Sequence, residues 1–266
     1  MAMESTNPVF RRGYAAMGTN RQTATTSVEV EALEQAYNAP AASSARTGRM
    51  TIDDVVIRTS VLFIILVAVG ALAWKANLGG GFLLIGILGG LALGMVNSFK
   101  TKVSPPLVIA YAAFEGLGLG VISHMYESQY PGIISQAVIG TLAAFAGMLF
   151  AYKTKRIRVT PKFTRVLIGA LTGYMILGFV SMISAFAGVG QGYGFYGVSG
   201  LGLLLAVGGV AFASFFLLLD FDMIENMIKN GAPHQEAWRA GFGLMVTVVW
   251  LYMEILRLIS ILRNDR

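Results

Sequence analysis

Residues 55–74 read VVIRTSVLFIILVAVGALAW, an apolar run about as long as the segment that an α-helix needs to cross a lipid bilayer. Comparable apolar segments recur along the rest of the chain. They span residues 82–97, 106–124, 132–152, 166–187, 200–219 and 242–262. The sequence therefore predicts an all-α, polytopic integral membrane protein with seven transmembrane helices.

The composition also favours a membrane protein. Of the 266 residues, 55% are apolar and 13% are charged, whereas about a quarter of the residues of a soluble domain are charged. The net charge of +6 comes from basic residues that cluster beside apolar segments. Such clustering encodes membrane orientation, so we expect the lipid bilayer as a partner and no nucleic acid.

The chain before the first apolar segment has a different character. Residues 1–50 are rich in Ala, Ser, Thr and Asn and contain no apolar segment. We expect them to form a disordered polar tail ahead of a membrane domain at residues 51–266. No stretch typical of a secretory signal precedes Val55, so the tail is expected to stay in the mature protein.

The loop between the fourth and fifth apolar segments predicts the orientation. Residues 153–165 carry six basic residues and no acidic one, so this loop is expected to face the cytoplasm. Alternation along the chain then places the N-terminus in the cytoplasm. Seven full crossings would put the C-terminus outside, although Arg257, Arg263 and Arg266 favour a seventh helix that crosses only partly.

Several glycines recur at intervals of four residues and should therefore line one face of a helix. Small residues let transmembrane helices approach closely, so this spacing predicts tight helix packing rather than a nucleotide site. The glycines in question are Gly86, Gly90 and Gly94, Gly116 and Gly120, and Gly169 and Gly173.

Acidic residues inside the apolar segments are the candidate functional residues, because a carboxylate at mid-bilayer costs a few kcal/mol unless it is paired or lines a cavity. Glu115 interrupts the third segment. Asp220 and Asp222 close the sixth, and Glu254 lies within the seventh. Asp220 and Asp222 are about 200° apart around a helix, so one of them should face the bundle. A solvated helix end is the alternative for Asp222, and a local salt bridge with Arg257 is the alternative for Glu254.

Asp220 and Glu254 would lie at similar depth if the chain reverses over residues 231–241. Asp220 lies 11 residues before that stretch and Glu254 lies 13 residues after it. A tight turn at Pro233 would instead leave Glu254 about 15 Å deeper. Two carboxylates in one dry site titrate as a unit and so sense protons. Their oxygens suit calcium, but two carboxylates supply too few ligands for more than weak binding.

The remaining residues predict no catalytic site. The chain has no cysteine, and its two histidines, His124 and His234, lack the paired spacing of a zinc or haem site. We expect both histidines to be solvated. No nucleophile motif accompanies the Ser and Thr residues. We therefore expect a protein that is not an enzyme and that holds no cofactor.

Three motifs indicate a family. They are the sequence FEG at residues 114–116, the acid-bearing end of the sixth segment with Leu219, Asp220 and Ile224, and the sequence LYME at residues 251–254. The last resembles the LYLD of the transmembrane Bax-inhibitor-motif proteins, the Bax inhibitor or YccA-like family that includes bacterial calcium-leak proteins. The resemblance covers residues 51–266.

This resemblance implies six helices around a central seventh, and a pH-sensitive calcium or cation leak channel in the bacterial plasma membrane. Asp220 and Glu254 would be the pH sensor that gates the pore, with Glu115 as a supporting polar site and calcium ions as the permeant species. Here the second acid is Glu rather than Asp, and the stretch between the acids is about ten residues longer than usual. Asp222 stands where the family commonly has an amide, so the choice between Asp220 and Asp222 stays open.

Two other kinds of function remain open. Members of the family have been assigned roles as regulators of stress or cell death that bind a membrane protease or other membrane proteins without transporting anything. Glycine-lined helix faces suit such a role. A proton-coupled secondary transporter is the third reading, but the internal repeats typical of that class are not evident.

Overall fold

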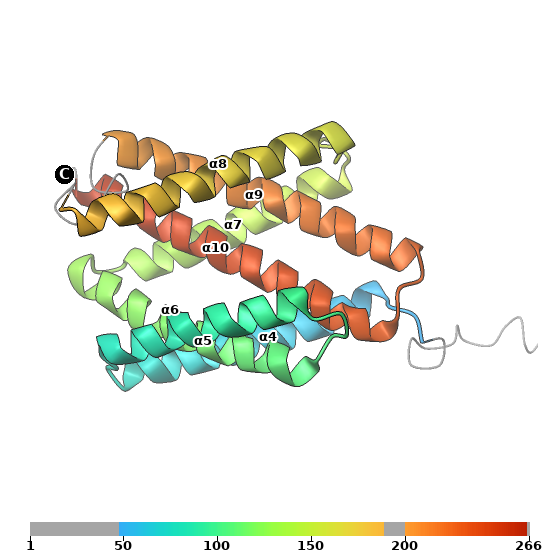
Figure 1. Cartoon of the computed structure of the whole chain (residues 1–266), viewed down its shortest axis with the longest axis horizontal. Helices are drawn as coiled ribbons and strands as arrows, with labels where there is room; N and C mark the ends of the chain where they lie inside the picture. Colours follow the sequence, from blue (N-terminus) through green and yellow to red (C-terminus); the bar gives the residue numbers. More distant parts are fainter. Residues whose placement is uncertain (1–47, 189–199, 265–266) are drawn as a thin grey trace, which may run out of the picture. The chain divides into compact units, whose positions relative to one another are not determined.

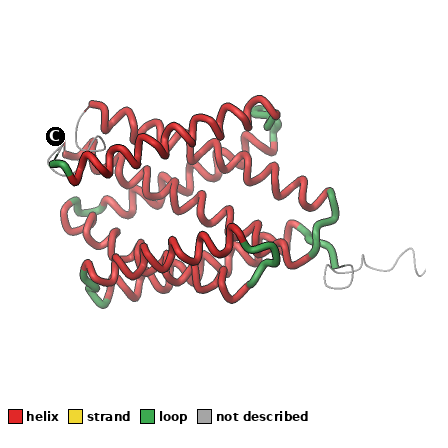
Figure 2. The backbone as a smooth tube through the Cα atoms, viewed as in Figure 1, coloured by secondary structure: helices red, strands yellow, loops and turns green. Residues whose placement is uncertain are grey.

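A computed structural model of the chain describes residues 48–188 and 200–264. In these residues there are seven long helices and no β-strand (Figures 1 and 2). The helices are α4 (Ile52–Lys75), α5 (Gly80–Phe99), α6 (Pro105–Gln129), α7 (Ile133–Lys153), α8 (Pro161–Phe186), α9 (Gly200–Lys229) and α10 (Ala237–Asn264). All seven are long and apolar enough to cross a membrane, which confirms the predicted all-α, seven-helix membrane fold. The predicted tail at residues 1–50 lies almost entirely outside the described residues.

Local signals set where the helices begin. Thr51 caps α4 in a capping box, in which its side chain accepts from the backbone N–H of Asp54 while the Asp54 carboxylate accepts from the backbone N–H of Thr51. Pro105 and Pro161 occupy the first turns of α6 and α8. The missing N–H of proline costs nothing there, because the first N–H groups of a helix have no intrahelical partner.

Helix α10 forms the centre of the bundle (Figure 1). It packs against α4, α6, α7 and α9. In its apolar stretch 56% of the residues are buried inside the bundle, compared with 11% in the apolar stretch of α8. The most extensive contact of α5 is with α6, and α8 packs on α9. The apolar faces that α5 and α8 leave exposed suit contact with lipid.

Helix α10 also crosses the whole bundle. At its start, the backbone N–H of His234 donates to the carbonyl oxygen of Gly48, just before α4 (2.9 Å). At its other end, Arg263 donates to the carbonyl oxygen of Pro131 in the α6–α7 connection (2.8 Å). The alternative of a seventh helix that crosses only partly was therefore wrong. Figure 1 shows the two ends of α10 at opposite ends of the bundle.

Glycines bring α4, α5 and α6 into backbone contact. A methyl group added at Gly86 of α5 would lie 2.6 Å from the backbone nitrogen of Gly118 in α6, and one added at Gly120 would overlap the backbone of Gly70 in α4. The predicted role of glycine in close packing is confirmed at these helices. The prediction was wrong for Gly169 and Gly173 of α8. A methyl group added at either position would have no described atom outside the helix's own backbone within 4 Å.

Candidate functional site

The connection between α9 and α10 decides which acids can meet. Helix α9 continues to Lys229, a short 3-10 helix spans His234–Glu236, and α10 begins at Ala237. The condition for pairing the acids, a chain reversal over residues 231–241, is therefore not met, and the alternative of a tighter turn near Pro233 holds. Ala237 and Ala240 are fully buried in a cluster with Met50 and Val55, so these small residues are helical because they pack against the start of α4.

Asp220 and Glu254 are consequently not brought together. Asp220 lies beside Thr247 of α10, with whose hydroxyl its carboxylate interacts. Thr247 precedes Glu254 by seven residues, which is about 10 Å along a helix. Glu254 lies instead against Gly209, eleven residues before Asp220 in α9. The pairing of the two acids was therefore wrong, because the tight turn sets them at different depths.

Asp220, nine residues before the end of α9, is the acid of that helix that faces α10. It is half-buried, and its Oδ2 atom is shielded and accepts no hydrogen bond from the part of the chain that the structure describes. Asp222 instead accepts a hydrogen bond from the side chain of Asn226 on the exposed surface of its own helix (2.9 Å). This arrangement agrees with the solvated helix end considered for Asp222.

Glu254 is buried, with 8% of its surface exposed, and is held by three side chains. Its Oε1 atom accepts hydrogen bonds from the hydroxyl of Tyr174 in α8 (2.6 Å) and from the indole N–H of Trp250 (3.1 Å). Its Oε2 atom lies 3.6 Å from Nη1 of Arg257. The local salt bridge with Arg257 is therefore formed, and Glu254 also ties α10 to α8.

Glu115 lies in a separate place, between α5 and α6. Its carboxylate faces Gly90, where an added methyl group would come within 2.9 Å of Oε2, and it interacts with the hydroxyl of Tyr111. The ring of Tyr111 packs edge-on against Phe242 of α10, with 4.9 Å between the ring centres. The structure therefore connects Glu115 to α10 through an aromatic contact rather than through Asp220 or Glu254.

No common metal site links these acids. Within residues 48–188 and 200–264, no group of three or more His, Asp or Glu side chains is placed to hold a metal ion. A cavity of about 480 Å³ lies between α4, α6, α7 and α10, but its lining is apolar apart from a few hydroxyls and includes none of the three acids. Two of those hydroxyls, on Ser123 and Tyr252, bond to each other (2.8 Å).

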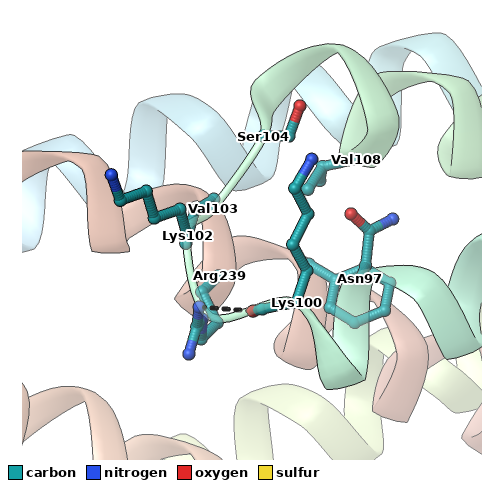
Figure 3. Close-up of a pocket in the computed structure, with 8 residues that line it drawn as sticks. Asn97, Lys100, Lys102, Val103, Ser104, Val108 and Arg239 are labelled. Atoms are coloured by element: carbon teal, nitrogen blue, oxygen red, sulfur yellow. Dashed lines mark hydrogen bonds between the residues drawn. The ribbon is translucent and has the colours of Figure 1, made fainter.

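A smaller pocket lies at the α5–α6 connection (Figure 3). There Arg239 of α10 donates to the carbonyl oxygens of Lys100 (3.1 Å) and Thr101 (2.8 Å). Its volume is about 10 Å³, enough for a single water molecule. These hydrogen bonds fasten the connection to α10, and the pocket is too small to be a ligand site.

A cluster of Asp54, Arg58 and His234 was missed by the sequence-based reasoning. Both histidines are half-buried rather than fully solvated as predicted: His234 contacts Arg58 and Asp54, and His124 packs edge-on against Trp74, with 5.3 Å between the ring centres. The available signal was Arg58, a charge inside the first apolar segment. A charged residue in such a segment is expected to have a partner.

A comparison with known protein families gives one match. The sequence model of the family described as Bax inhibitor 1 like matches residues 7–264. No curated protein matches the chain.

Proposed function

Because the chain belongs to the Bax inhibitor 1 like family, we propose that it is a pH-sensitive leak channel for calcium or other cations. Calcium ions and protons are its permeant and regulating species. On this proposal it is not an enzyme, requires no cofactor, and resides in the bacterial plasma membrane with its N-terminus in the cytoplasm.

One observation carries this proposal. Asp220 Oδ2 and Glu254 Oε2, on the adjacent helices α9 and α10, are both shielded and accept no hydrogen bond from the described residues. A buried carboxylate oxygen without a hydrogen-bond donor is costly, and a proton would satisfy either atom; at Glu254 the nearest cation is Arg257, 3.6 Å from Oε2. Because the two acids lie at different depths, we propose that they act in series along the α9–α10 interface rather than as one pair.

Glu254 is the proposed gate. Protonation would remove its charge and with it the attraction to Arg257, and would weaken the hydrogen bonds that it accepts from Tyr174 and Trp250. Those contacts hold α10 to α8 and to its own next turn. Their loss would let α10 move against its neighbours. Asp220, beside Thr247, is the proposed second station for a proton or a cation.

Calcium flux into proteoliposomes over a pH series tests the proposal. Glu254→Gln and Asp220→Asn mimic the protonated side chains, and each is expected to reduce the pH dependence of the flux. Asp222→Asn is the matched control, since Asp222 accepts a hydrogen bond from Asn226 on the exposed surface of α9, and it should leave the pH dependence unchanged. Unaltered pH dependence in both test variants would contradict the proposal.

A second candidate function is that of a non-transporting regulator that binds a membrane protease or another membrane protein. The open face of α8 at Gly169 and Gly173 favours it, because small residues four apart suit close contact with a further transmembrane helix. Under this reading a stoichiometric partner would co-purify, Gly173→Leu would release it, and the liposomes would show no flux.

A further inference from the structure

Three side chains meet where the α9–α10 connection touches the start of α4. Nη2 of Arg58 lies 2.6 Å from Nε2 of His234, and Nη1 of Arg58 lies 3.1 Å from Oδ1 of Asp54. That same Oδ1 is 3.3 Å from Nε2 of His234. The Asp54 and Arg58 side chains are 10% and 11% exposed, whereas that of His234 is 35% exposed and so remains accessible to protons.

Main-chain hydrogen bonds run alongside this cluster. The N–H of His234 donates to the carbonyl oxygen of Gly48 (2.9 Å), and the N–H of Met50 donates to the carbonyl oxygen of Ala232 (2.8 Å). The Arg58 guanidinium also lies over the ring of Trp238 in α10, 5.7 Å from its centre. The cluster is therefore one of several contacts that hold the α9–α10 connection against the start of α4.

The contact between Arg58 and His234 requires a neutral imidazole. The guanidinium is always protonated and only donates, so the imidazole nitrogen that it contacts must accept. Nε2 is the nearer of the two ring nitrogens, with Nδ1 3.3 Å from the same Nη2. A protonated ring has no acceptor nitrogen. It would set a second cation 2.6 Å from Arg58 and would compete with Arg58 for Asp54.

We propose that Asp54, Arg58 and His234 form a proton-sensitive latch that fastens the α9–α10 connection to α4 when His234 is neutral and releases it when His234 is protonated. The connection joins the two helices that carry Asp220 and Glu254. The claim that the latch regulates ion flow therefore rests on the proposed channel function, whereas the existence of the latch does not.

The other charged groups nearby are already engaged or stand apart. Arg49 lies against Gly231 on the connection and adds positive charge to that side. Glu236 pairs with Arg239 (3.1 Å) within the connection and the first turn of α10. At the end of α9, Glu225 pairs with Lys229, and on the first turn of α4 Asp53 is exposed.

The distance between α4 and the connection is the direct readout. Because the chain has no cysteine, spin labels can be attached at Ile52→Cys and Gln235→Cys, two exposed positions on either side of the latch. Their separation is measured by pulsed electron paramagnetic resonance in nanodiscs at about pH 5 and at about pH 8. We expect a short, narrow distance distribution at high pH and a longer, broader one at low pH.

Three variants in this labelled background assign the change. His234→Gln keeps a neutral acceptor that does not titrate, and should hold the short distance at both pH values. His234→Lys carries a permanent charge, and should show the long distance at both. His124→Gln is the matched control and should respond to pH as the parent does.

Two results would overturn the latch: a parent distance that does not change with pH, or a His234→Gln protein that changes as much as the parent. If His234→Lys does not fold, the comparison of the parent with His234→Gln still decides. A pH-dependent distance without calcium flux would reject the channel and keep the latch. A pH-dependent flux with a constant distance would reject the latch and keep the channel.

Discussion

The carboxylate of Asp220 in α9 lies beside the hydroxyl of Thr247 in α10. At this contact Thr247 lies opposite Asp220, and Glu254 lies two turns further along α10. The acids therefore lie in different surroundings. Asp220 lies closer than Glu254 to the α9–α10 connection, and Glu254 is among Tyr174, Trp250 and Arg257.

Asp220→Asn and Glu254→Gln are expected to act independently on stability. Sites about 10 Å apart without shared partners are additive to within about 0.5 kcal/mol. The free energy of unfolding of the double variant, measured by denaturant titration in detergent, should equal the sum of the single effects. As a positive control, Glu254→Gln and Tyr174→Phe share a hydrogen bond and should not be additive. A coupling free energy above about 1 kcal/mol between the two substitutions would show that the two acids interact directly.

Removal of Arg257 alone should be strongly destabilising. Arg257→Gln would leave the Glu254 carboxylate buried without its cation, and breaking a buried ion pair in this way costs about 3–5 kcal/mol. The double variant Glu254→Gln with Arg257→Gln should recover part of the loss. Thermal unfolding in detergent provides the measurement. Arg263→Gln, at an exposed hydrogen bond at the end of α10, is the control and should change the Tm much less.

Gly120 should tolerate no side chain. An added methyl group would overlap the backbone of Gly70, which cannot move aside as a flexible side chain could, so Gly120→Ala should cost about 1–3 kcal/mol. Gly173→Ala is the matched control, since open space surrounds that position on α8. Equal Tm values for the two variants would show that the α4–α6 contact is not as close as described.

The proposed orientation can be tested by labelling single cysteines with a membrane-impermeant thiol reagent. Gln129 and Arg156 are exposed positions on either side of α7. Gln129 is the last residue of α6, and Arg156 lies between α7 and α8. In intact cells Gln129→Cys should react, whereas Arg156→Cys, in the basic loop, should react only after permeabilisation. The reverse pattern would place the N-terminus outside the cell.

The number and approximate extent of the helices were predictable, because long apolar runs and the prolines at helix starts are local signals. The register of α9 and α10 was not. Ala237 and Ala240 favour a helix by propensity, but Arg239 and Gly241 interrupt the apolar pattern there, and the contact of the alanines with Met50 and Val55 is far away in the sequence. The contact between Arg58 and His234 spans 176 residues, so no local pattern could indicate it. The acids themselves were identifiable because a charge in an apolar segment is conspicuous wherever it packs.

The hydrogen bonds that join residues 48 and 50 to residues 234 and 232 also constrain the order of assembly. Residue 232 is synthesised only after the six helices α4 to α9. The helix that leads the membrane domain into the bilayer is thus the first to be made, yet its starting end is fastened only when the chain reaches the last helix. A nascent chain that ends after α6 but before residue 232 has every contact of α4 with α6 available and none of the hydrogen bonds that hold the start of α4.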